Sequence, residues 1–559
     1  MLKNPYEIKY KNLSKWLQFN GSSWYNRSME NTFTKEQLDN FHKDILVTTI
    51  LQQQNALLEI NKKFDLLLEQ IRISNQARFG QSSEKVALQN QLTFCFNEAE
   101  VTVADANDIT EPTIEQVIPE HKRRVKKKGK RDEDLSAFPV RIENHVLSED
   151  KLQELFDGDY RKLPDEVYKK LEFHPATFEV VEHHIAVYCG NQNQKIVKAG
   201  HPTELLNNSI ATPSLVAAIL NAKYVNSIPL YRLEQEFKRN EVNIARQVMA
   251  NWVIRSSERY LSLLYDRMHR EIYKSHILHA DETPVRIAKD GRDTKANSYM
   301  WVYRTGEYGG VPPAVLYEYQ KTRKADHPRK FLAGYKGVVV CDGYQVYHKL
   351  EKERPDELTV AGCWAHSRRR FANICKSLGK KASKGTLAEL ALGQIAQIYH
   401  IDNQLADLEP EERLTKRQLL VKPLVETFFA WVKDNESKVP RNSETGKGFT
   451  YCLNQQNYLK VFLEDPAVPL DNNAAETAIR SFCVGKNNWH VIDTVHGAES
   501  SAIVYSLAES AKANNLKPYN YFMHVLEEIP KHMDDTNLDF LGDLLPWSRA
   551  LPEECKKKL

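Results

Sequence analysis

The sequence predicts an α/β domain that carries an all-α insertion and follows a coiled coil, a small β module and a helix-turn-helix-like helical domain. Short apolar runs bounded by turn residues are typical of strands between His276 and Phe371, and helical periodicity dominates on both sides. The first and fourth runs each contain a carboxylate, Asp281 and Asp342, which is costly in a buried strand unless paired or bound to metal. The expected strands are His276–Ile287, Ser298–Thr305, Ala314–Gln320, Gly337–Leu350 and Thr359–Phe371, with a helix at His327–Gly334.

The composition is that of an ordinary globular protein. The chain has 559 residues, of which 42% are hydrophobic and 27% charged, and its net charge is +3. No apolar run approaches the roughly 20 residues that cross a bilayer, and the first residues contain no apolar signal core. None of the eight cysteines forms a C-x-x-C pair, which argues against a disulfide framework. We expect a cytoplasmic protein without a membrane partner.

A heptad pattern follows the N-terminal segment 1–33, within a helical region at 34–92. Apolar residues alternate in steps of four and three, with one polar member, which is typical of a coiled-coil seam. The alternative is one amphipathic helix packed on its own domain. We favour self-association, so a homo-oligomer is expected. The seam consists of Leu46, Ile50, Gln53, Leu57, Ile60, Phe64, Leu67 and Ile71.

The charge of the side chains in the linker at 93–139 changes abruptly from negative to positive along the chain. Its first part is acidic with few large apolar residues, which is typical of a solvated linker. Its second part is densely basic and suits a phosphate-binding arm, although a solvated charge run would look the same. The candidate DNA-binding residues of this arm are Arg123, Arg124, Lys126, Lys127 and Lys128.

Two further regions precede the strand-rich block. Region 140–205 alternates well enough for a small β module, and region 206–275 is helical. Within the second region, a helix, a break at Arg239–Val242 and a helix at Asn243–Val253 resemble a helix-turn-helix, with Asn243 as the expected N-cap. Many helical hairpins of this kind bind nothing. The residues expected to face a DNA groove are Arg246, Gln247 and Asn251, and those expected in the core are Val248, Trp252 and Val253.

A third acid on a later helix would complete a metal site with the two strand aspartates. Glu476 opens a helix in the stretch DNNAAETAIR, and Arg480 lies four residues on, where it could hold a phosphate or orient the carboxylate. Oxygen-only ligation suits two Mg²⁺ or Mn²⁺ ions, which together serve in-line phosphoryl displacement. The alternative is a helix start in which Asn473 is the N-cap and Glu476 its partner.

Several motifs together resemble one family. HADETPV, CDGYQVY, AGCWAHSRRRF, LDNNAAETAIR, VGKNNW and the tail LLPW are similar, in this order, to DDE transposases of the insertion-sequence-sixty-six type. The resemblance covers nearly the whole chain. It implies a ribonuclease-H-like catalytic fold with the triad Asp281, Asp342 and Glu476. It also implies a DNA transposase that cleaves at insertion-element ends and joins the 3′-hydroxyl ends to target DNA. A nuclease of the same fold that cuts without joining, or a binding-only relic, are the alternatives.

The long gap between Asp342 and Glu476 organises the second half of the chain. The expected core therefore has a first part at 276–373 and a second part at 466–530, with the catalytic helix in the second. Between them we expect an all-α insertion at 374–465, with helices at Leu387–Leu408, Arg413–Asn435 and Lys447–Asp465. A C-terminal tail occupies 531–559.

Weaker candidates complete the expected site. His366 and Arg369 could reach the scissile phosphate, and Lys486 could contact DNA, although a structural role is an equal alternative for the first two. Family members usually carry a cysteine-rich zinc module, but the corresponding stretch here has only Cys189, and the C-x-x-H pair Cys363–His366 has no second pair. We therefore expect no zinc. Small accessory proteins are possible partners, and a nucleoid-associated location follows from DNA binding.

Overall fold

The computed structural model describes residues 47, 50–57, 178–185, 187–189, 196–198, 203–293, 296–308 and 310–558. The segment 1–33, most of the heptad region, the whole linker with its basic arm, and most of region 140–205 lie outside these residues. No helix in the described part of the chain is long and apolar enough to span a membrane. Residues 50–57 are helical, and the seam residues Ile50 and Leu57 are 54% and 58% exposed. Self-association through the seam stays a prediction.

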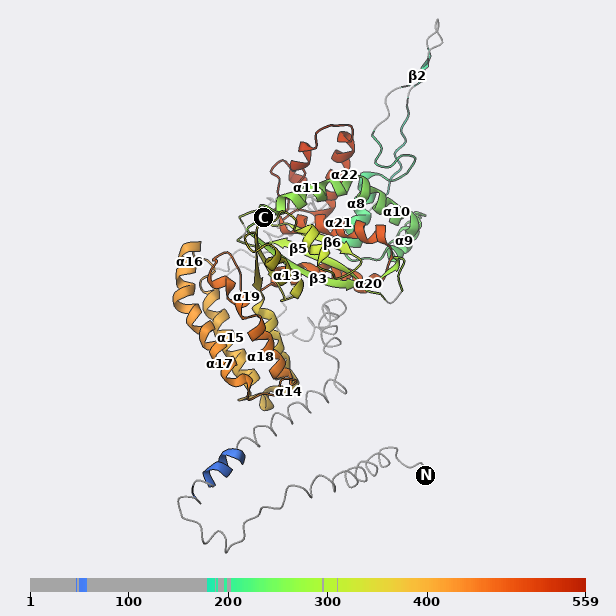
Figure 1. Cartoon of the computed structure of the whole chain (residues 1–559). Helices are drawn as coiled ribbons and strands as arrows, with labels where there is room; N and C mark the ends of the chain where they lie inside the picture. Colours follow the sequence, from blue (N-terminus) through green and yellow to red (C-terminus); the bar gives the residue numbers. More distant parts are fainter. Residues whose placement is uncertain are drawn as a thin grey trace, which may run out of the picture.

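A five-stranded mixed sheet forms the centre of the described structure (Figure 1). Its strand order is β6-β5-β3-β7-β8. The first three strands are antiparallel to one another, whereas β3, β7 and β8 run parallel. All five expected strands are therefore present, and the two that carry the aspartates are neighbours. The strands are β3 (Ile277–Val285), β5 (Ser298–Thr305), β6 (Val315–Gln320), β7 (Gly337–Cys341) and β8 (Leu358–Gly362).

The last two strands are shorter than expected, because each gives way to a helix. β7 ends at Cys341, where the Asp342 side chain accepts a hydrogen bond from the Tyr344 amide at 3.1 Å and Gly343 adopts a φ of +91°. This turn, which glycine accommodates without strain, starts helix α13 (Gln345–Glu353). The expected extension of β7 to Leu350 is thus wrong. β8 likewise ends at Gly362, and helix α14 (Trp364–Ala382) follows.

The parallel strands are buried on both faces, which explains their continuous apolar sequences. Alternate residues of a strand point to opposite faces. Val339 and Cys341 of β7 enter the larger hydrophobic cluster, whereas Val338 and Val340 enter a second one. The larger cluster includes helices before and after the sheet, and the second is made mainly by helices from α14 to η5. The sheet is therefore covered by two separate groups of helices.

The helices that precede the sheet begin as the sequence predicts. Pro213 occupies the first turn of α8, and Thr212 caps it by accepting the Leu215 amide. The following elements are η2 (Asn221–Val225), α9 (Leu230–Arg239), α10 (Arg246–Ser256), η3 (Ser257–Leu261) and α11 (Ser262–Ile272), with α8 at Pro213–Leu220.

The break between α9 and α10 is longer than expected. Helix α10 starts at Arg246 with Ala245 in the N-cap position, so the expected start and cap at Asn243 are wrong. This shift places Met249 in the core, whereas Val248 is 41% exposed, and the core position expected for Val248 is wrong. Trp252 and Val253 are buried as expected.

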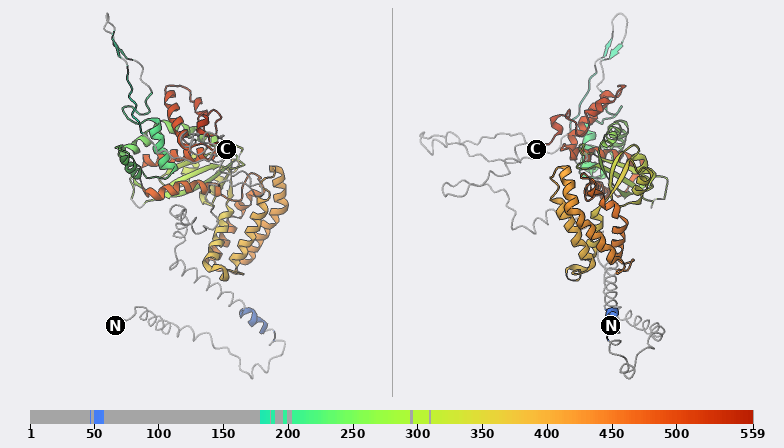
Figure 2. Two further views of the ribbon diagram at one scale, coloured as in Figure 1. Left: turned by 180° about the vertical axis from the view of Figure 1, so that it is seen from behind. Right: turned by 60° about the vertical axis from the view of Figure 1, so that its left-hand side comes forward.

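The expected helical insertion forms a bundle beside the sheet (Figures 1 and 2). Its helices bury the apolar faces that their periodicity predicts, including Phe428 and Val432 of α17. Helix α18 begins earlier than expected, because the Ser443 hydroxyl caps it by accepting the Gly446 amide. After α14, the elements are α15 (Leu387–Asn403), α16 (Pro410–Lys416), η4 (Arg417–Val421), α17 (Lys422–Glu436), α18 (Glu444–Asn454), α19 (Gln456–Lys460) and η5 (Val461–Leu463).

The chain then returns to the sheet. Helix α20 (Asn473–Trp489) packs on β3 and β5, and α21 (Val495–Ala513) packs on β6. In the latter contact, the Ser506 and Ser510 hydroxyls accept the amides of β6 at 2.8 Å. The remaining elements are α12 (Asp326–Phe331) inside the sheet region, then α22 (Pro518–Glu528), η6 (Ile529–His532), η7 (Asp539–Gly542) and η8 (Glu553–Cys555).

Two small sheets complete the fold. β4 (Ile287–Lys289) pairs with β9 (Ile492–Thr494), a link between the end of β3 and the segment after α20 that the sequence did not predict. β1 (Val187–Cys189) pairs with β2 (Ile196–Lys198). Residues 178–185 were expected in a strand but form none, and Val180 is 90% exposed. Only a small hairpin of the expected β module therefore lies within the described residues.

Replacing Glu318 of β6 with glutamine is expected to stabilise the fold at pH 8 but not at pH 5. Burial raises the pKa of Glu318 to about 7, and its Oε2 is buried without a hydrogen-bond partner. A carboxyl group whose pKa is higher in the folded state than in the unfolded state destabilises the fold once it loses its proton. This loss of stability grows as pH rises from the pKa of the unfolded state to the pKa of the folded state. The expected gain at pH 8 is on the order of 2 kcal/mol. Thermal unfolding across this pH range measures it.

The matched control for this prediction is Glu307→Gln. Glu307 is exposed just after β5, so this variant should unfold like the parent at every pH. If Glu318→Gln also follows the parent from pH 5 to pH 8, the buried carboxylate carries no penalty and the interpretation fails.

Candidate active site

Asp281 and Asp342 occupy one row across the parallel strands. β3 pairs with β7 so that Ile277 faces Val338, and the same register continued places Asp281 level with Asp342. The pairing of β7 with β8 similarly places Asp342 level with Cys363. Paired residues of neighbouring strands point to the same face at a spacing of about 4.8 Å per strand. The end of the parallel strands, where ligands bind in open α/β sheets, is thus lined by carboxylates.

The surroundings of Asp281 raise the pKa of its carboxyl group, and the other predicted acids contribute to this shift. Its pKa is raised to about 8, first by burial, then by the charges of Glu282 and Asp342, and to a smaller extent by Glu476. One hydrogen bond, from the Glu282 amide at 2.8 Å, acts in the opposite direction. A divalent cation would relieve this repulsion, so the residues present fit a metal.

The start of α20 is tied to β3 beside Asp281. The Asn472 side chain is fully buried; its Nδ2 donates to the Ala280 carbonyl at 2.9 Å and its Oδ1 lies 2.8 Å from His279 Nδ1. Asn472, not Asn473, precedes the helix, and its side chain makes no cap. The alternative interpretation, a capping pair of Asn473 with Glu476, is therefore not what the structure has: Asn473 lies inside α20, and Asn472 binds the sheet.

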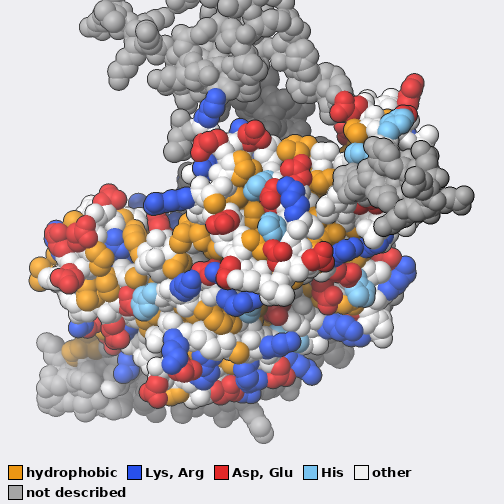
Figure 3. Space-filling model, turned by 90° about the horizontal axis from the view of Figure 1, so that it is seen from above, with side chains coloured by type: hydrophobic (Ala, Val, Ile, Leu, Met, Phe, Trp, Pro, Cys, Tyr) orange, Lys and Arg blue, Asp and Glu red, His pale blue; other side chains and the backbone are white. Residues whose placement is uncertain are grey.

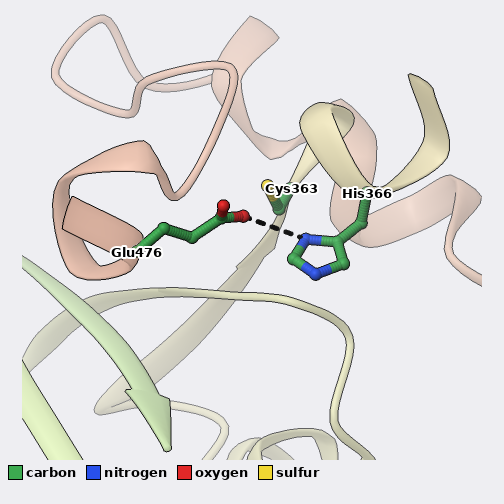
Figure 4. A group of neighbouring side chains, drawn as sticks. All are labelled: Cys363, His366 and Glu476. Atoms are coloured by element: carbon green, nitrogen blue, oxygen red, sulfur yellow. Dashed lines mark ion pairs between the residues drawn. The ribbon is translucent and has the colours of Figure 1, made fainter. Parts of the chain in front are cut away.

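Glu476 faces the turn after β8 (Figure 4). Its carboxylate accepts a hydrogen bond from Arg369 at 2.6 Å and lies 3.7 Å from His366 Nδ1. Both residues come from the first turns of α14, which follows β8. The structure thus brings three expected site residues together, although His366 and Arg369 were expected at the scissile phosphate.

Cys363, His366 and Glu476 place their ligand atoms within 4.8 Å of one another, and Asp281 and Asp342 are not members of this group. It is the one such group among the described residues. The sequence pattern did not reveal this group, because Glu476 lies far along the chain from the C-x-x-H pair of Cys363 and His366. Burial raises the pKa of the Cys363 thiol to about 12, and its sulfur accepts the Asn472 amide. These three residues come from β8–α14 and from the start of α20, so the turn after β8 and the helix that carries Glu476 meet at this point.

A second acid on β3, Glu282, was missed from the sequence. Its side chain is 2% exposed and forms an ion pair with Arg323, whose Nε lies 2.7 Å from Oε1. Burial raises the pKa of Glu282 to about 7 in spite of this cation. Consecutive residues of a strand point to opposite faces of the sheet, so Glu282 cannot share a partner with Asp281. An acid at this position of an apolar strand was therefore a signal that Glu282 has a buried partner of its own.

The other candidate DNA-binding residues are dispersed. Lys486 donates to the Thr283 hydroxyl at 3.2 Å and to the Pro284 carbonyl at 3.0 Å, so it fastens α20 to β3. Arg480 is exposed, and Glu476 pairs with Arg369 instead of it. Arg246, Gln247 and Asn251 are exposed on α10, as a groove-facing surface requires. The basic arm from Arg123 to Lys128 lies outside the described residues.

On one face of the described structure, surface charge does not trace a DNA path. On the face drawn in Figure 3, Lys and Arg side chains are mixed with acidic ones and do not gather into one broad patch. Local arrangements of charge around the site therefore matter more than the overall field.

Comparison with known proteins gives the family of the chain. Residues 208–500 match the model described as "Transposase IS66 family", which is more than half of the chain. Residues 506–547 match the "IS66 C-terminal element", and residues 66–141 match "Transposase C of IS166 homeodomain".

Three relatives come from Sinorhizobium fredii (strain NBRC 101917 / NGR234), and all are described as uncharacterized. Protein y4hP is 28% identical over 69% of this chain and 71% of its own length. Protein y4qI is 24% identical over 87% of this chain and 89% of its own length. Protein y4jD is 29% identical over 64% of this chain and 70% of its own length. With a family model spanning more than half of its residues, the chain belongs to the IS66 family of transposases.

Proposed function

We propose that this chain is a catalytically active DDE transposase. It binds the ends of an insertion element, cleaves phosphodiester bonds there and joins the 3′-hydroxyl ends to target DNA. The observation that carries the proposal is the register of β3 and β7, which places Asp281 level with Asp342 at the carboxyl ends of the parallel strands, next to the start of the helix that carries Glu476. Three carboxylates gathered at one edge of a sheet are costly without a function, and family membership supports transposition as that function.

The catalytic fold in this proposal is ribonuclease-H-like. The sheet order β6-β5-β3-β7-β8, with three antiparallel strands followed by two parallel ones, supports this assignment. So does the placement of the acids, with Asp281 on the central strand and Asp342 directly after its parallel neighbour. The helices from α15 to η5 then form an insertion at 374–465 that shapes the site and returns the chain to α20.

Asp281, Asp342 and Glu476 would hold two Mg²⁺ or Mn²⁺ ions. Such ions, when bound, supply positive charge to both the attacking and the leaving oxygen of an in-line displacement. Asn472 positions Glu476 against β3, and Arg369 holds its carboxylate until a cation or a DNA phosphate competes for it. A zinc ion is not part of the proposal, because the three proposed ligands are carboxylates, and oxygen-only ligation suits Mg²⁺ or Mn²⁺.

DNA binding involves several parts of the chain. Arg246, Gln247 and Asn251 on α10 contact a groove, and the basic arm at 121–131 neutralises phosphates. Arg480 is exposed on α20 near Glu476 and is available to a phosphate. A homo-oligomer formed through the heptad seam would bring two element ends together, and the protein would act at the nucleoid.

The test uses the purified chain with a plasmid that carries the terminal repeats flanking its gene. With Mg²⁺ or Mn²⁺ we expect cuts at the element ends and joined products in a second, target plasmid. Cuts without joined products would favour the nuclease alternative. Binding to the ends without any cut, under conditions in which the chain is folded, would leave only a binding protein and overturn the proposal.

Replacing Arg369 with glutamine is expected to tighten Mn²⁺ binding by up to about fivefold, because the guanidinium no longer competes for Glu476. Calorimetric titration of the DNA-free protein with Mn²⁺ measures this directly. Arg368→Gln, at an exposed neighbouring position, is the matched control and should leave the affinity unchanged. Weaker Mn²⁺ binding in Arg369→Gln would mean that Arg369 supports the metal site and does not compete with it.

A further inference from the structure

A cavity of about 790 Å³ opens beside Asp342, between α13 on the sheet side and α18 and α19 of the helical bundle. We propose that this cavity receives one unpaired nucleotide of the DNA strand whose phosphate lies at the candidate active site. The proposal rests on the proposed function and adds a substrate feature to it: the DNA end is opened, and one nucleotide leaves the stack.

The charge around the cavity suits a nucleic acid backbone. Arg323, Lys349, Lys352 and Arg370 line it, and Asp342 is the one acid among its described lining residues. Lys352 and Arg370 are exposed and have no carboxylate within ion-pair distance in the part of the chain that the structure describes. Cations in the lining of a cavity that are not neutralised by a carboxylate are available to phosphates.

Aromatic side chains line the same space. His348 of α13 and Tyr458 of α19 stack on each other with centroids 3.7 Å apart and planes 4° from parallel. Tyr451 of α18 lies under the Arg370 guanidinium at 4.4 Å. Planar groups combined with cations are the recurring means by which proteins hold unpaired bases.

Three buried polar atoms of the lining residues have no hydrogen-bond partner, and one of them, His366 Nδ1, lies 3.7 Å from the Glu476 carboxylate. His348 Nε2 and Gln455 Oε1 make no hydrogen bond, although these residues are only 9% and 8% exposed. Buried polar atoms without partners are rare in native proteins and point to a missing ligand. The edge of a nucleobase offers both donors and acceptors to such groups, whereas an apolar peptide segment would leave them unsatisfied.

The cavity is continuous with the candidate active site. The Tyr451 hydroxyl donates to the Asp342 carbonyl at 2.8 Å, and a Cβ on Gly343 would lie only 3.0 Å from the Gln455 side chain. Asp342 and the residue after it therefore both belong to the cavity wall. A volume of this size holds a single small ligand and not a duplex, so a base that enters it has left its pair. Enzymes that act on nucleic acids extrude nucleotides in this way.

The test is a binding experiment without divalent metal, so that no cleavage occurs. Element-end duplexes carry 2-aminopurine, a base whose fluorescence rises when it unstacks, at successive positions around the cleavage site. We expect one position to brighten on binding. Replacing that nucleotide by an abasic site should weaken binding of the parent chain by about fivefold or more, but should change binding of Tyr458→Ala much less.

Gln455→Leu is the second variant, in case Tyr458→Ala does not fold, and it should also lose sensitivity to the abasic site. Lys336→Gln, at an exposed lysine outside the cavity lining, should behave like the parent. If the parent chain cleaves element ends but no position brightens and the abasic site has no effect, the cavity proposal fails while the proposed function stands. If the abasic site has no effect but Lys352→Gln weakens DNA binding, the cavity contacts only the DNA backbone. That result also overturns the cavity proposal.

Discussion

Replacing Asp342 with asparagine is expected to lower DNA cleavage and joining by at least about 1,000-fold while binding of element-end DNA stays unchanged. The variant removes one negative charge from the row of carboxylates that would hold the metal ions. It keeps the fold, because the asparagine oxygen can still accept the Tyr344 amide that starts the turn into α13. Gel assays of cut and joined products measure activity, and mobility shifts measure binding.

Asp356→Asn is the matched control for this prediction. Asp356 is exposed in the segment between α13 and β8, away from the parallel strand ends, so cleavage and joining should be those of the parent. If joining survives in Asp342→Asn, the assignment of Asp342 to the catalytic triad is wrong. If binding is lost together with cleavage, the variant does not separate chemistry from DNA recognition.

The sheet could be predicted because its strands carry local signals. Ser298–Thr305 matches β5 residue for residue, since an apolar, aromatic run between turn residues has few alternatives. The errors fall where side chains act on the backbone at a distance or in a turn. The predicted strand through Asp342 is too long, because the chain turns at Gly343 with a positive φ, and apolar patterning does not reveal such a turn. Helix α10 begins later in the chain than predicted, and no side chain caps its first turn.

The candidate site could be predicted only in part. Asp281 and Asp342 were visible as acids in apolar strands, and Glu476 as an acid at a helix start. Their partners were not visible, because Arg369 and Asn472 act through contacts between segments far apart in sequence. The buried pair of Glu282 with Arg323 and the cavity beside Asp342 depend in the same way on how the helical bundle meets the sheet.

One buried arginine links that bundle to the segment before α20, the helix that carries Glu476. Arg417 of η4 is 3% exposed and pairs with Asp402 of α15, with Nε 2.7 Å from Oδ1 and Nη2 3.1 Å from Oδ2. Its Nη1 also donates to the carbonyls of Phe462 and Val468, each at 2.9 Å. These carbonyls belong to the segment that leads from α19 to α20. The guanidinium therefore fixes the path by which Glu476 returns to the sheet.

Replacing Arg417 with methionine is expected to destabilise the helical bundle by about 3–5 kcal/mol, because Asp402 is left buried without its cation and several carbonyls lose their donor. Cleavage should fall as well, although Asp281, Asp342 and Glu476 are all retained, since the segment before α20 is no longer held. Chemical denaturation and limited proteolysis of the bundle measure the first effect, and the plasmid assay measures the second.

The control for Arg417→Met is its neighbour in sequence, Lys416→Met. Lys416 pairs with Glu412 in an ion pair that is about half exposed, and such pairs contribute about 0–1 kcal/mol, so this variant should be nearly as stable and as active as the parent. Replacing both buried partners, as Arg417→Met with Asp402→Leu, should recover part of the stability, because no lone charge remains buried. It should recover less of the cleavage, since the carbonyls of Phe462 and Val468 still lack a donor. Equal recovery of both would mean that Arg417 stabilises the bundle without positioning Glu476.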